Sequence, residues 1–417
     1  IDSKTVTKDD GWKWSWTNLP KYDKGKLNVY TISEEVVKGY VTEVQGYDVI
    51  NTPTVIHVSK VDVTNQKELP GAKIQIIDEN GKVVEEWISG DKPHDIYGLE
   101  IGKTYTLHEE VAPDGFTIAA DTTFIINEDG TVTSTGTVTT DGILLIEDMP
   151  TSVKVSKVDI TNQKELPGAT IQIIADGKVV VEWVSTDTPM EIVGLKTGVT
   201  YTLHEEVAPD GFMVAADTTF TIDEYGNVTP TGTITSDGSL LIEDKPTSVK
   251  VSKVDVTDQK ELPGATIQII DENGKVVAEW VSSDTPHEVT GLIVGKTYTL
   301  HEEVAPHGYK VASDTTFVIN PDGSVTSTGT VTEDGILLIE DEFLPISIDG
   351  TKTWEDKDDQ DGKRPVSITI HLYADGKEIA SAVVTKEDGW KWHFGNLPEY
   401  KNGKKIEYTI SEDVVKD

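Results

Sequence analysis

The sequence contains no cysteine, which excludes disulfide bonds and thiol or thioester chemistry. Basic residues are fewer than acidic residues: the sequence has 36 lysines and arginines and 73 aspartates and glutamates. The net charge of −37 argues against binding to nucleic acid or to an anionic membrane. Long apolar runs are also missing: the longest are short stretches such as residues 143–146, so no membrane insertion is expected. These absences indicate a highly soluble chain that must gain stability from something other than disulfides.

Helix signals are rare, and the residues that are abundant favour strands. Threonine, valine and isoleucine dominate many segments of the chain. Turn-forming pairs recur about every ten residues, for example at Asn80-Gly81, Asp129-Gly130 and Asp322-Gly323. The sequence therefore predicts an all-β fold.

Internal repetition divides the chain. The motif VSKVD begins at Val58 and returns at Val155 and Val251, each time followed by closely related sequence. A repeat of about 96 residues is long enough to fold as a domain of its own. We therefore expect five consecutive modules arranged like beads on a string, of which the first and last are partial, covering residues 1–53, 54–150, 151–246, 247–343 and 344–417.

The two ends carry a second repeat type. Residues 1–39 match residues 379–417, with DGWKW at Asp10 and again at Asp388. The first copy lacks the front half of the module and the last copy lacks the back end. One interpretation is a window from a longer repetitive protein, in keeping with the absence of an initiator methionine, a signal peptide and a sorting tail. The other is that a neighbouring copy supplies the missing strands head-to-tail.

A lysine, a glutamate and an aspartate recur in each central repeat where the apolar face of a strand is expected. Lys60, for instance, is in phase with Ile56 and Val58, and strand side chains alternate between faces. Buried charges are costly unless they are paired or consumed by a reaction. The three triads are Lys60, Glu109 and Asp148; Lys157, Glu205 and Asp244; and Lys253, Glu302 and Asp341.

Burial suggests a reaction for these groups. An apolar core lowers the pKa of a lysine and raises that of a carboxylic acid. A neutral lysine amine can then attack the aspartate carboxyl while a protonated glutamate polarises it and moves protons. The product is a Lys–Asp side-chain amide with loss of one water. An ordinary ion pair at a strand edge is the alternative, since duplicated domains also inherit accidental residues.

The central repeats resemble Cna-B-type domains of Gram-positive surface proteins, in the branch that forms intramolecular isopeptide bonds. They are especially similar to the isopeptide domain of a streptococcal fibronectin-binding protein. The resemblance implies tandem immunoglobulin-like (prealbumin-like) β-sandwiches, in which Lys60 bonds to Asp148 with help from Glu109, and likewise in the other two repeats. His307, where the other repeats have aspartate, departs from the pattern outside the triad. The motifs that carry the resemblance are VSKVD at Val58, KELPGA at Lys67, YTLHEEVAPDGF at Tyr105 and LLIED at Leu144.

The terminal modules resemble the collagen-adhesin B repeats of the same superfamily. That resemblance implies Lys352 as the amine and Glu412 as the acid of one module, and Asn51 as the acceptor and Glu34 as the acid of the other. Neither module holds all three groups, so Lys352 and Asn51 form a possible split cross-link. The matching motifs are GTKTW at Gly350, DGKRP at Asp361, DGWKW at Asp388 and YTISED at Tyr408.

Other candidate sites are weaker. The acidic segment 356–365 is expected to be a turn rather than a calcium loop, because its glycine does not fit an EF-hand register. The tryptophans at 12, 14 and 16 are expected to pack in a core rather than to bind sugar. We expect no metal site, no cofactor and no turnover of an external substrate. The histidines that precede each triad glutamate, His108, His204 and His301, are expected on the surface.

Together these expectations favour a structural stalk or fibre segment of a Gram-positive cell-surface adhesin or pilus-like filament. The alternative is a module that itself recognises a host or matrix protein such as collagen or fibronectin. The expected partners are neighbouring copies of the chain, and a host protein bound through domains outside it. The resemblance implies an extracellular location, with wall anchoring through segments outside these residues.

Overall fold

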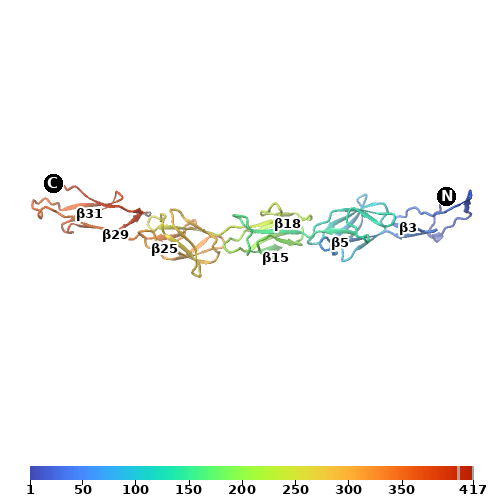
Figure 1. Ribbon diagram of the computed structural model, residues 1–417, viewed down its shortest axis with the longest axis horizontal. Coiled ribbons are helices and arrows are strands. Elements are labelled where there is room, and N and C mark those ends of the chain that lie inside the picture. The colour runs from blue at the N-terminus through green and yellow to red at the C-terminus, as the bar shows by residue number, and fades with distance from the viewer. Residues whose placement is uncertain (402–403, 416–417) are drawn as a thin grey trace. The chain divides into compact units, whose positions relative to one another are not determined.

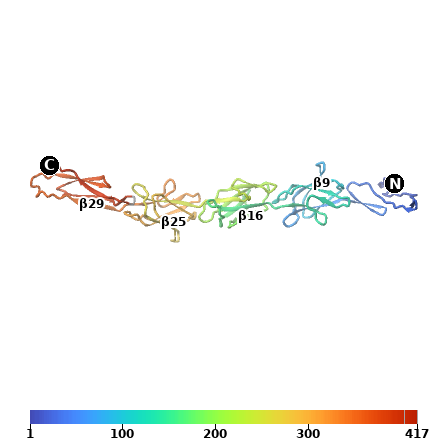
Figure 2. The same cartoon turned by 45° about the horizontal axis from the view of Figure 1, so that its top comes forward.

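The computed structural model describes residues 1–401 and 404–415. Strands and connecting loops make up most of the ribbon (Figure 1), and a view turned by 45° agrees (Figure 2). Among the described residues the only helical segment is a short 3-10 turn, η1 (Lys8–Asp10). The all-β prediction is confirmed. In the same part of the chain, no helix is long and apolar enough to cross a membrane.

Contacts between residues divide the chain into two compact units. The first contains residues 1–152, 192–199 and 221–229, and the second contains residues 153–191, 200–220 and 230–417. The domain boundaries expected near residues 53, 150, 246 and 343 remain a prediction.

The first unit begins with short strands and continues into the first central repeat. Its strands as far as residue 148 are β1 (Tyr22–Asp23), β2 (Lys26–Leu27), β3 (Tyr40–Gln45), β4 (Asp48–Pro53), β5 (Val55–Asp62), β6 (Lys73–Asp78), β7 (Val83–Ile88), β8 (His94–Tyr97), β9 (Thr104–Val111), β10 (Thr122–Ile126), β11 (Val132–Ser134) and β12 (Leu144–Asp148).

Two sheets enclose the core of the first repeat. One has the strand order β12-β5-β8 and the other β11-β10-β9-β6-β7. Apolar side chains from both sheets, such as Val58, Ile74 and Phe124, form one buried cluster. The first strand β5 and the last strand β12 pair in parallel, with Lys60 opposite Ile146. This pairing brings the two ends of the repeat together.

The alternation expected from the sequence is present. Along β9, Tyr105, Leu107 and Glu109 are buried while the residues between them are partly exposed. Along β12, Leu144, Ile146 and Asp148 are buried in the same way. Each charged residue thus continues a row of apolar residues into the core.

The second and third central repeats have corresponding strands. Those of the second repeat are β13 (Ser152–Asp159), β14 (Thr170–Ala175), β15 (Lys178–Val184), β16 (Met190–Val193), β17 (Thr200–Val207), β18 (Thr218–Ile222), β19 (Val228–Pro230) and β20 (Leu240–Asp244). Those of the third are β21 (Ser248–Asp255), β22 (Thr266–Ile270), β23 (Val276–Val281), β24 (His287–Thr290), β25 (Thr297–Val304), β26 (Thr315–Ile319), β27 (Val325–Ser327) and β28 (Leu337–Asp341).

The pairings of the first repeat recur in both. In the second repeat β13 pairs in parallel with β20, and β14 pairs with β15 and β17. In the third repeat the sheet orders are β24-β21-β28 and β23-β22-β25-β26-β27, again around one apolar core.

The C-terminal part of the second unit forms a smaller sandwich. The described strands are β29 (Pro345–Thr351), β30 (Ser367–Ala374), β31 (Lys377–Thr385), β32 (Lys391–Pro398), β33 (Tyr400–Lys401), β34 (Lys404–Lys405) and β35 (Tyr408–Glu412). One sheet is β29-β32 and another is β31-β30-β35. Their core includes Leu372, Trp390 and Phe394. The last two residues of the predicted module 344–417 lie outside the described residues.

Candidate functional site

The lysine and aspartate of each triad lie on neighbouring strands of one sheet. In the first repeat Lys60 comes from β5 and Asp148 from β12, and Lys60 Nζ lies in contact with Asp148 Oδ1. The parallel register explains the contact, because the residue opposite Lys60 is Ile146 and Asp148 follows two positions later on the same face. The sequence-predicted amine and carboxyl are therefore brought together.

The glutamate of each triad comes from the facing sheet. Glu109 lies on β9, a strand labelled in the turned view (Figure 2), and its Oε1 is 3.2 Å from Lys60 Nζ. Its other oxygen, Oε2, accepts a hydrogen bond of 2.7 Å from the backbone N–H of Ala119. One carboxylate oxygen is thus held by the loop after β9, and the other faces the amine.

The geometry recurs in the other repeats. Lys157 Nζ contacts Asp244 Oδ1 and lies 3.1 Å from Glu205 Oε1, while Lys253 Nζ contacts Asp341 Oδ1 and lies 3.2 Å from Glu302 Oε1. The backbone N–H groups of Ala215 and Ala312 hold the two glutamates at 2.7 and 2.6 Å. All nine triad side chains are 0 or 1% exposed.

These buried groups are poorly satisfied by hydrogen bonds. In the first repeat Lys60 Nζ, Glu109 Oε1 and both carboxylate oxygens of Asp148 are buried and make no hydrogen bond of normal geometry, and the same atoms recur in the other two triads. A buried polar group without a partner costs about 1–3 kcal/mol. Condensation of the amine with the aspartate carboxyl would remove the charges that make the site unfavourable.

Burial also moves the proton equilibria of the carboxyl groups. It raises the pKa of Glu109 to about 8, although the nearby Lys60 charge opposes the shift. It likewise raises the pKa of Asp148 above its ordinary value. In the other repeats burial raises the pKa of Asp244 and of Asp341 to about 7, again against the lysine charge. Each pair of carboxyls therefore retains a proton close to neutral pH.

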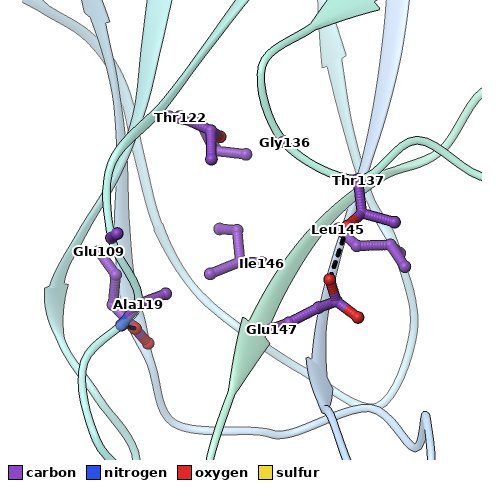
Figure 3. A pocket seen from close by; sticks show the side chains of 10 residues that line it. Glu109, Ala119, Thr122, Gly136, Thr137, Leu145, Ile146 and Glu147 are labelled. Carbon is purple, nitrogen blue, oxygen red and sulfur yellow. Dashed lines mark hydrogen bonds between the residues drawn. The ribbon is translucent and has the colours of Figure 1, made fainter.

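A small pocket opens beside the first triad. Its volume is about 160 Å³, and Glu109, Ala119, Thr137 and Glu147 are among its lining residues. Figure 3 shows Glu109 with the Ala119 nitrogen on one side and, on the other, Thr137 donating a hydrogen bond of 2.7 Å to Glu147, with Ile146 between them. Glu109 thus borders this pocket, although its side chain is 0% exposed.

The C-terminal module brings two of its predicted residues together. Lys352, directly after β29, lies 2.9 Å from Glu412 Oε2 on β35. The two side chains are 27% and 26% exposed, in contrast to the closed central triads. Glu412 Oε1 is buried without a hydrogen-bond partner, and the amine lies 4.9 Å from the centroid of the Trp354 ring.

The N-terminal module brings together its own two residues. The Thr42 hydroxyl lies 2.8 Å from Asn51 Oδ1 and 3.1 Å from Glu34 Oε2, so it is within hydrogen-bonding distance of both. Thr42 and Asn51 face each other across the β3–β4 hairpin. Sequence reasoning missed Thr42, since a threonine in a strand is common and carries no signal of its own.

The alanine N–H groups were also missed. A signal for them exists: in all three repeats an alanine follows the triad glutamate by ten residues, at Ala119, Ala215 and Ala312. A backbone donor is not specified by residue type, however, so the repetition points to the position without showing the contact.

The weaker candidates are placed as follows. His108 lies against Asp121 at 2.6 Å, partly exposed, as expected for a surface residue. Asp356 is paired with Arg364 at 2.6 Å, which fits an acidic turn. Within residues 1–401 and 404–415, no group of three or more histidine, aspartate or glutamate side chains is arranged to hold a metal ion.

The expectation that the N-terminal tryptophans pack in a core is wrong for Trp12, which is 64% exposed, whereas its counterpart Trp390 is 8% exposed. Trp390 packs among strands such as β30, and residues 1–53 contain no counterpart of those strands.

Comparison with known proteins identifies two kinds of domain. The model of the prealbumin-like fold domain matches residues 54–140, 151–236 and 247–333. The model of the Cna protein B-type domain matches residues 1–52 and 348–417.

A curated relative, the collagen adhesin of Staphylococcus aureus, is 29% identical over 457 aligned residues, which cover 100% of this chain and 35% of that protein. The chain therefore spans about a third of the relative's length.

Similar solved structures include the Bacillus anthracis TIE protein, at 17% identity and a TM-score of 0.37, covering 86% of this chain and 69% of that one. The shaft pilin spaA of Lactobacillus rhamnosus GG matches at 16% identity and a TM-score of 0.21, covering 46% of this chain and 97% of the pilin.

Proposed function

The chain belongs to the prealbumin-like fold domain family, with Cna-B-type repeats of Gram-positive surface proteins, and from this premise we propose that it is a structural stalk or fibre segment of a cell-surface adhesin or pilus-like filament. One observation carries the proposal. In each central repeat a buried lysine on the first strand contacts a buried aspartate on the last strand, with a glutamate beside the amine. We propose that each pair condenses to an intramolecular isopeptide bond.

The reaction needs no external reactant. The neutral Lys60 amine attacks the carboxyl carbon of Asp148, the new C–N bond forms, and the C–O bond to the hydroxyl breaks. The neutral amine carries two N–H hydrogens: one stays as the single N–H of the amide, and the other leaves as a proton that combines with the departing hydroxyl to form water. If the pair begins as ammonium and carboxylate, the extra ammonium proton first moves to the carboxylate. Glu109 donates a proton to the aspartate oxygen and takes one from the nitrogen, so it ends as it began.

Preorganisation lowers the activation barrier of the reaction, and burial of the charged groups favours the uncharged product. Holding the amine and carboxyl in contact can lower the barrier by about 7–11 kcal/mol, because no translational entropy remains to be lost. The raised pKa of Glu109 keeps a proton available near neutral pH. The pocket beside Glu109 offers a path by which the released water can leave. The protein reacts once with itself, which is self-crosslinking and not turnover of a substrate.

The position of each bond suits a load-bearing segment. Because β5 and β12 are the first and last strands of the repeat, an amide between Lys60 and Asp148 carries tension from one linker to the next without unfolding the sandwich between them. A cross-link that closes about 90 residues stabilises a domain by about 4–5 kcal/mol on the chain-entropy account developed for disulfides. Because the chain has no cysteine, the amide provides the stabilisation that a disulfide bond provides in other proteins.

The proposed cellular location rests on the same family membership. We propose an extracellular, cell-surface location, with wall anchoring and any ligand-binding head supplied by segments outside these residues. A second candidate function is direct recognition of a matrix protein, favoured by the name of the curated relative, a collagen adhesin. Surface plasmon resonance of this chain on immobilised collagen and fibronectin tests it: saturable binding supports direct recognition, and no binding favours the stalk.

Intact-mass spectrometry tests the cross-links. The native chain should be lighter than its sequence by three waters, and Glu109→Ala should be lighter by only two. The matched control is Glu110→Ala, the exposed neighbour on the opposite face of β9, which should retain all three losses. Peptide mapping should recover a branched peptide joining Lys60 to Asp148. A native chain with the full sequence mass would refute the proposal.

A further inference from the structure

The aspartate strand of the first central repeat is short and lies at the edge of its sheet. Strand β12 has five residues, and in the order β12-β5-β8 its neighbour is β5. The parallel register places Ile146 opposite Lys60, so that Asp148 reaches the amine. A slip of one residue would turn Asp148 to the other face, and a slip of two would move it about 6–7 Å along the strand. The contact between amine and carboxyl therefore depends on what holds the register of β12.

The loop that follows β5 holds the end of β12 at two points. The backbone N–H of Val63 donates a hydrogen bond of 2.9 Å to the carbonyl oxygen of Asp148. Gln66 Nε2 donates one of 3.2 Å to Glu147 Oε1, whose second carboxylate oxygen accepts the bond from Thr137 that Figure 3 shows. The last two residues of the aspartate strand are thus tied to the loop that leaves the lysine strand.

Both contacts recur in the second and third repeats. In each, a glutamine side chain donates to the glutamate beside the triad aspartate, and a backbone N–H donates to the carbonyl of that aspartate. The contacts are Gln163 with Glu243 at 3.1 Å, Gln259 with Glu340 at 3.0 Å, Ile160 with Asp244 at 2.9 Å and Val256 with Asp341 at 3.0 Å.

The glutamine of this loop occupies a backbone conformation that favours glycine. The φ angles of Gln66, Gln163 and Gln259 are 57°, 58° and 56°. This left-handed conformation is unfavourable for a residue with a Cβ atom and costs glycine nothing. The Gln66 side chain offers a compensation, because its amide donates to the Val63 carbonyl at 3.3 Å as well as to Glu147. A strained residue that is held in place by its own contacts is typical of functional sites.

The third repeat anchors the same loop with a different donor. In the first repeat the Asn65 amide donates a hydrogen bond of 2.6 Å to Asp62 at the end of β5. The residue equivalent to Asn65 in the third repeat is Asp258, and a carboxylate cannot donate. There the Tyr309 hydroxyl donates to Asp255 at 2.8 Å, and the first two repeats have phenylalanine at the position of Tyr309. The two substitutions compensate each other, so the loop is anchored in all three repeats.

We propose that Gln66 is a positioning residue of the cross-linking reaction, and that its counterparts in the other two repeats act likewise. By holding Glu147, the Gln66 side chain fixes the register of β12, so that the Asp148 carboxyl stays against the Lys60 amine until the amide forms. The proposal rests on the isopeptide chemistry of the proposed function and identifies what orients the aspartate in that reaction.

The rate of cross-linking in newly made chains tests the proposal. The full chain is synthesised in a cell-free system, synthesis is stopped, and samples are quenched in acid at intervals and digested. Mass spectrometry then gives the branched and linear peptides of each repeat. Gln66→Gly removes the side-chain contact and the backbone strain together. Its first repeat should cross-link about tenfold more slowly than in the native chain, because a misplacement of about 1 Å can cost about 100-fold. The other two repeats of the same molecules should keep the native rate.

Variants of the partner glutamate show whether the contact itself matters. Glu147→Ala should slow the first repeat at least as much as Gln66→Gly, and the double variant should be no slower than Glu147→Ala alone. Glu147→Gln should keep the native rate, since its amide oxygen still accepts from Gln66 and its NH₂ group can donate to the Thr137 hydroxyl. Gln75→Ala is the matched control: it removes two glutamine–glutamate hydrogen bonds of 2.7 Å from the facing sheet and should leave the rate unchanged.

The third repeat provides a rescue. Tyr309→Phe removes the hydroxyl that anchors its loop and should slow cross-linking in that repeat alone. Adding Asp258→Asn supplies the amide donor that the first repeat uses and should restore the native rate. A double variant as slow as Tyr309→Phe would overturn the role of the loop in the third repeat.

Hydrogen exchange separates positioning from a merely structural role. In Glu109→Gln, whose first repeat is expected not to cross-link, adding Gln66→Gly should leave the exchange of β6 and β9 unchanged, because glycine relieves the strain as the exposed hydrogen bond is lost. A loss of protection that matches the loss of rate would overturn the positioning role. A native rate in Gln66→Gly would refute it and leave the proposed function intact, whereas a native chain without branched peptides would refute the proposed function itself.

Discussion

Residues 1–39 and residues 379–417 carry closely matching sequences, but the second copy alone forms long strands. In that copy β31, β32 and β35 build two sheets. At the equivalent positions of the first copy no strand is present, and only η1, β1 and β2 form. The contrast shows which local structures the shared sequence forms when it has no neighbouring strands to pair with.

What survives in both copies is local. The Thr7 hydroxyl donates to Asp10 at 2.9 Å and the Thr385 hydroxyl donates to Asp388 at 2.8 Å, so the same turn forms twice. The short hairpin β1–β2 also has its counterpart in β33–β34. The strands that are lost are those that pair with β29 and β30 in the second copy. Turns need only their own residues, whereas strands need a partner.

The same contrast separates the complete central modules from the terminal ones. Each central triad is closed from solvent and contains a lysine, a glutamate and an aspartate, whereas Lys352 and Glu412 remain about a quarter exposed. We attribute the difference to the aspartate-bearing strand, β12, β20 or β28, which lies along one edge of the lysine strand in each central repeat. The predictions below test this contrast from the largest expected effect to the smallest.

Preventing the cross-links that we propose for the central repeats should have the largest effect. Glu109→Gln, Glu205→Gln and Glu302→Gln combined keep the side-chain size but remove the proton transfer. Each repeat should lose about 4–5 kcal/mol of unfolding free energy, because its first and last strands are no longer joined. Urea unfolding followed by circular dichroism, with intact mass as the check on bond loss, measures the effect. Equal stability of the uncross-linked variant and the native chain would contradict the account.

The equivalent tryptophans of the two terminal copies should respond differently to the same change. Trp390→Ala should destabilise the C-terminal module by about 3–5 kcal/mol, because it removes a large side chain from a packed core. Trp12→Ala should cost under about 0.5 kcal/mol, since that side chain is exposed. Limited proteolysis with mass mapping reports on each end separately. Similar losses at both ends would mean that the first copy is packed after all.

The sequence was sufficient to predict that the charged residues of the central triads lie on buried faces, because this placement depends on a local rule. Alternation along β5, β9 and β12 places Lys60, Glu109 and Asp148 on buried faces, and this needs no knowledge of the neighbouring strands. The all-β class follows from the same alternation and from the turn pairs.

Other features depend on partners that are distant in the sequence. The N–H of Ala119 reaches Glu109 because the loop after β9 folds back, and a loop has no periodicity from which to infer this. The exposure of Trp12 could not be predicted from its own segment either, since Trp390 is buried within the identical DGWKW motif. What differs is the presence of β29 and β30, which is a property of the whole module.

The smallest effect is a pH dependence that should distinguish a closed triad from an open one. In Lys60→Met the cross-link cannot form, and Glu109 and Asp148 remain buried together without a cation. Burial already raises the pKa of Glu109 to about 8 in the presence of Lys60, and the lysine charge opposes that shift, so its removal keeps the pKa high. The folded variant therefore holds a proton that the unfolded chain releases above about pH 4.

Since the folded state binds the extra proton, stability is greatest at low pH and falls as the pH rises from about 4 through 8, by about 1.4 kcal/mol for each pKa unit of difference. Lys352→Met is the matched control, because it removes the same amine from a site whose side chains are about a quarter exposed. Thermal unfolding of both variants across this range, beside the native chain, measures the difference. If the stability of Lys60→Met instead rose with pH, its buried carboxyls would ionise in the fold as readily as in water. Burial would then not explain how the central triads differ from the partly exposed residues of the terminal modules.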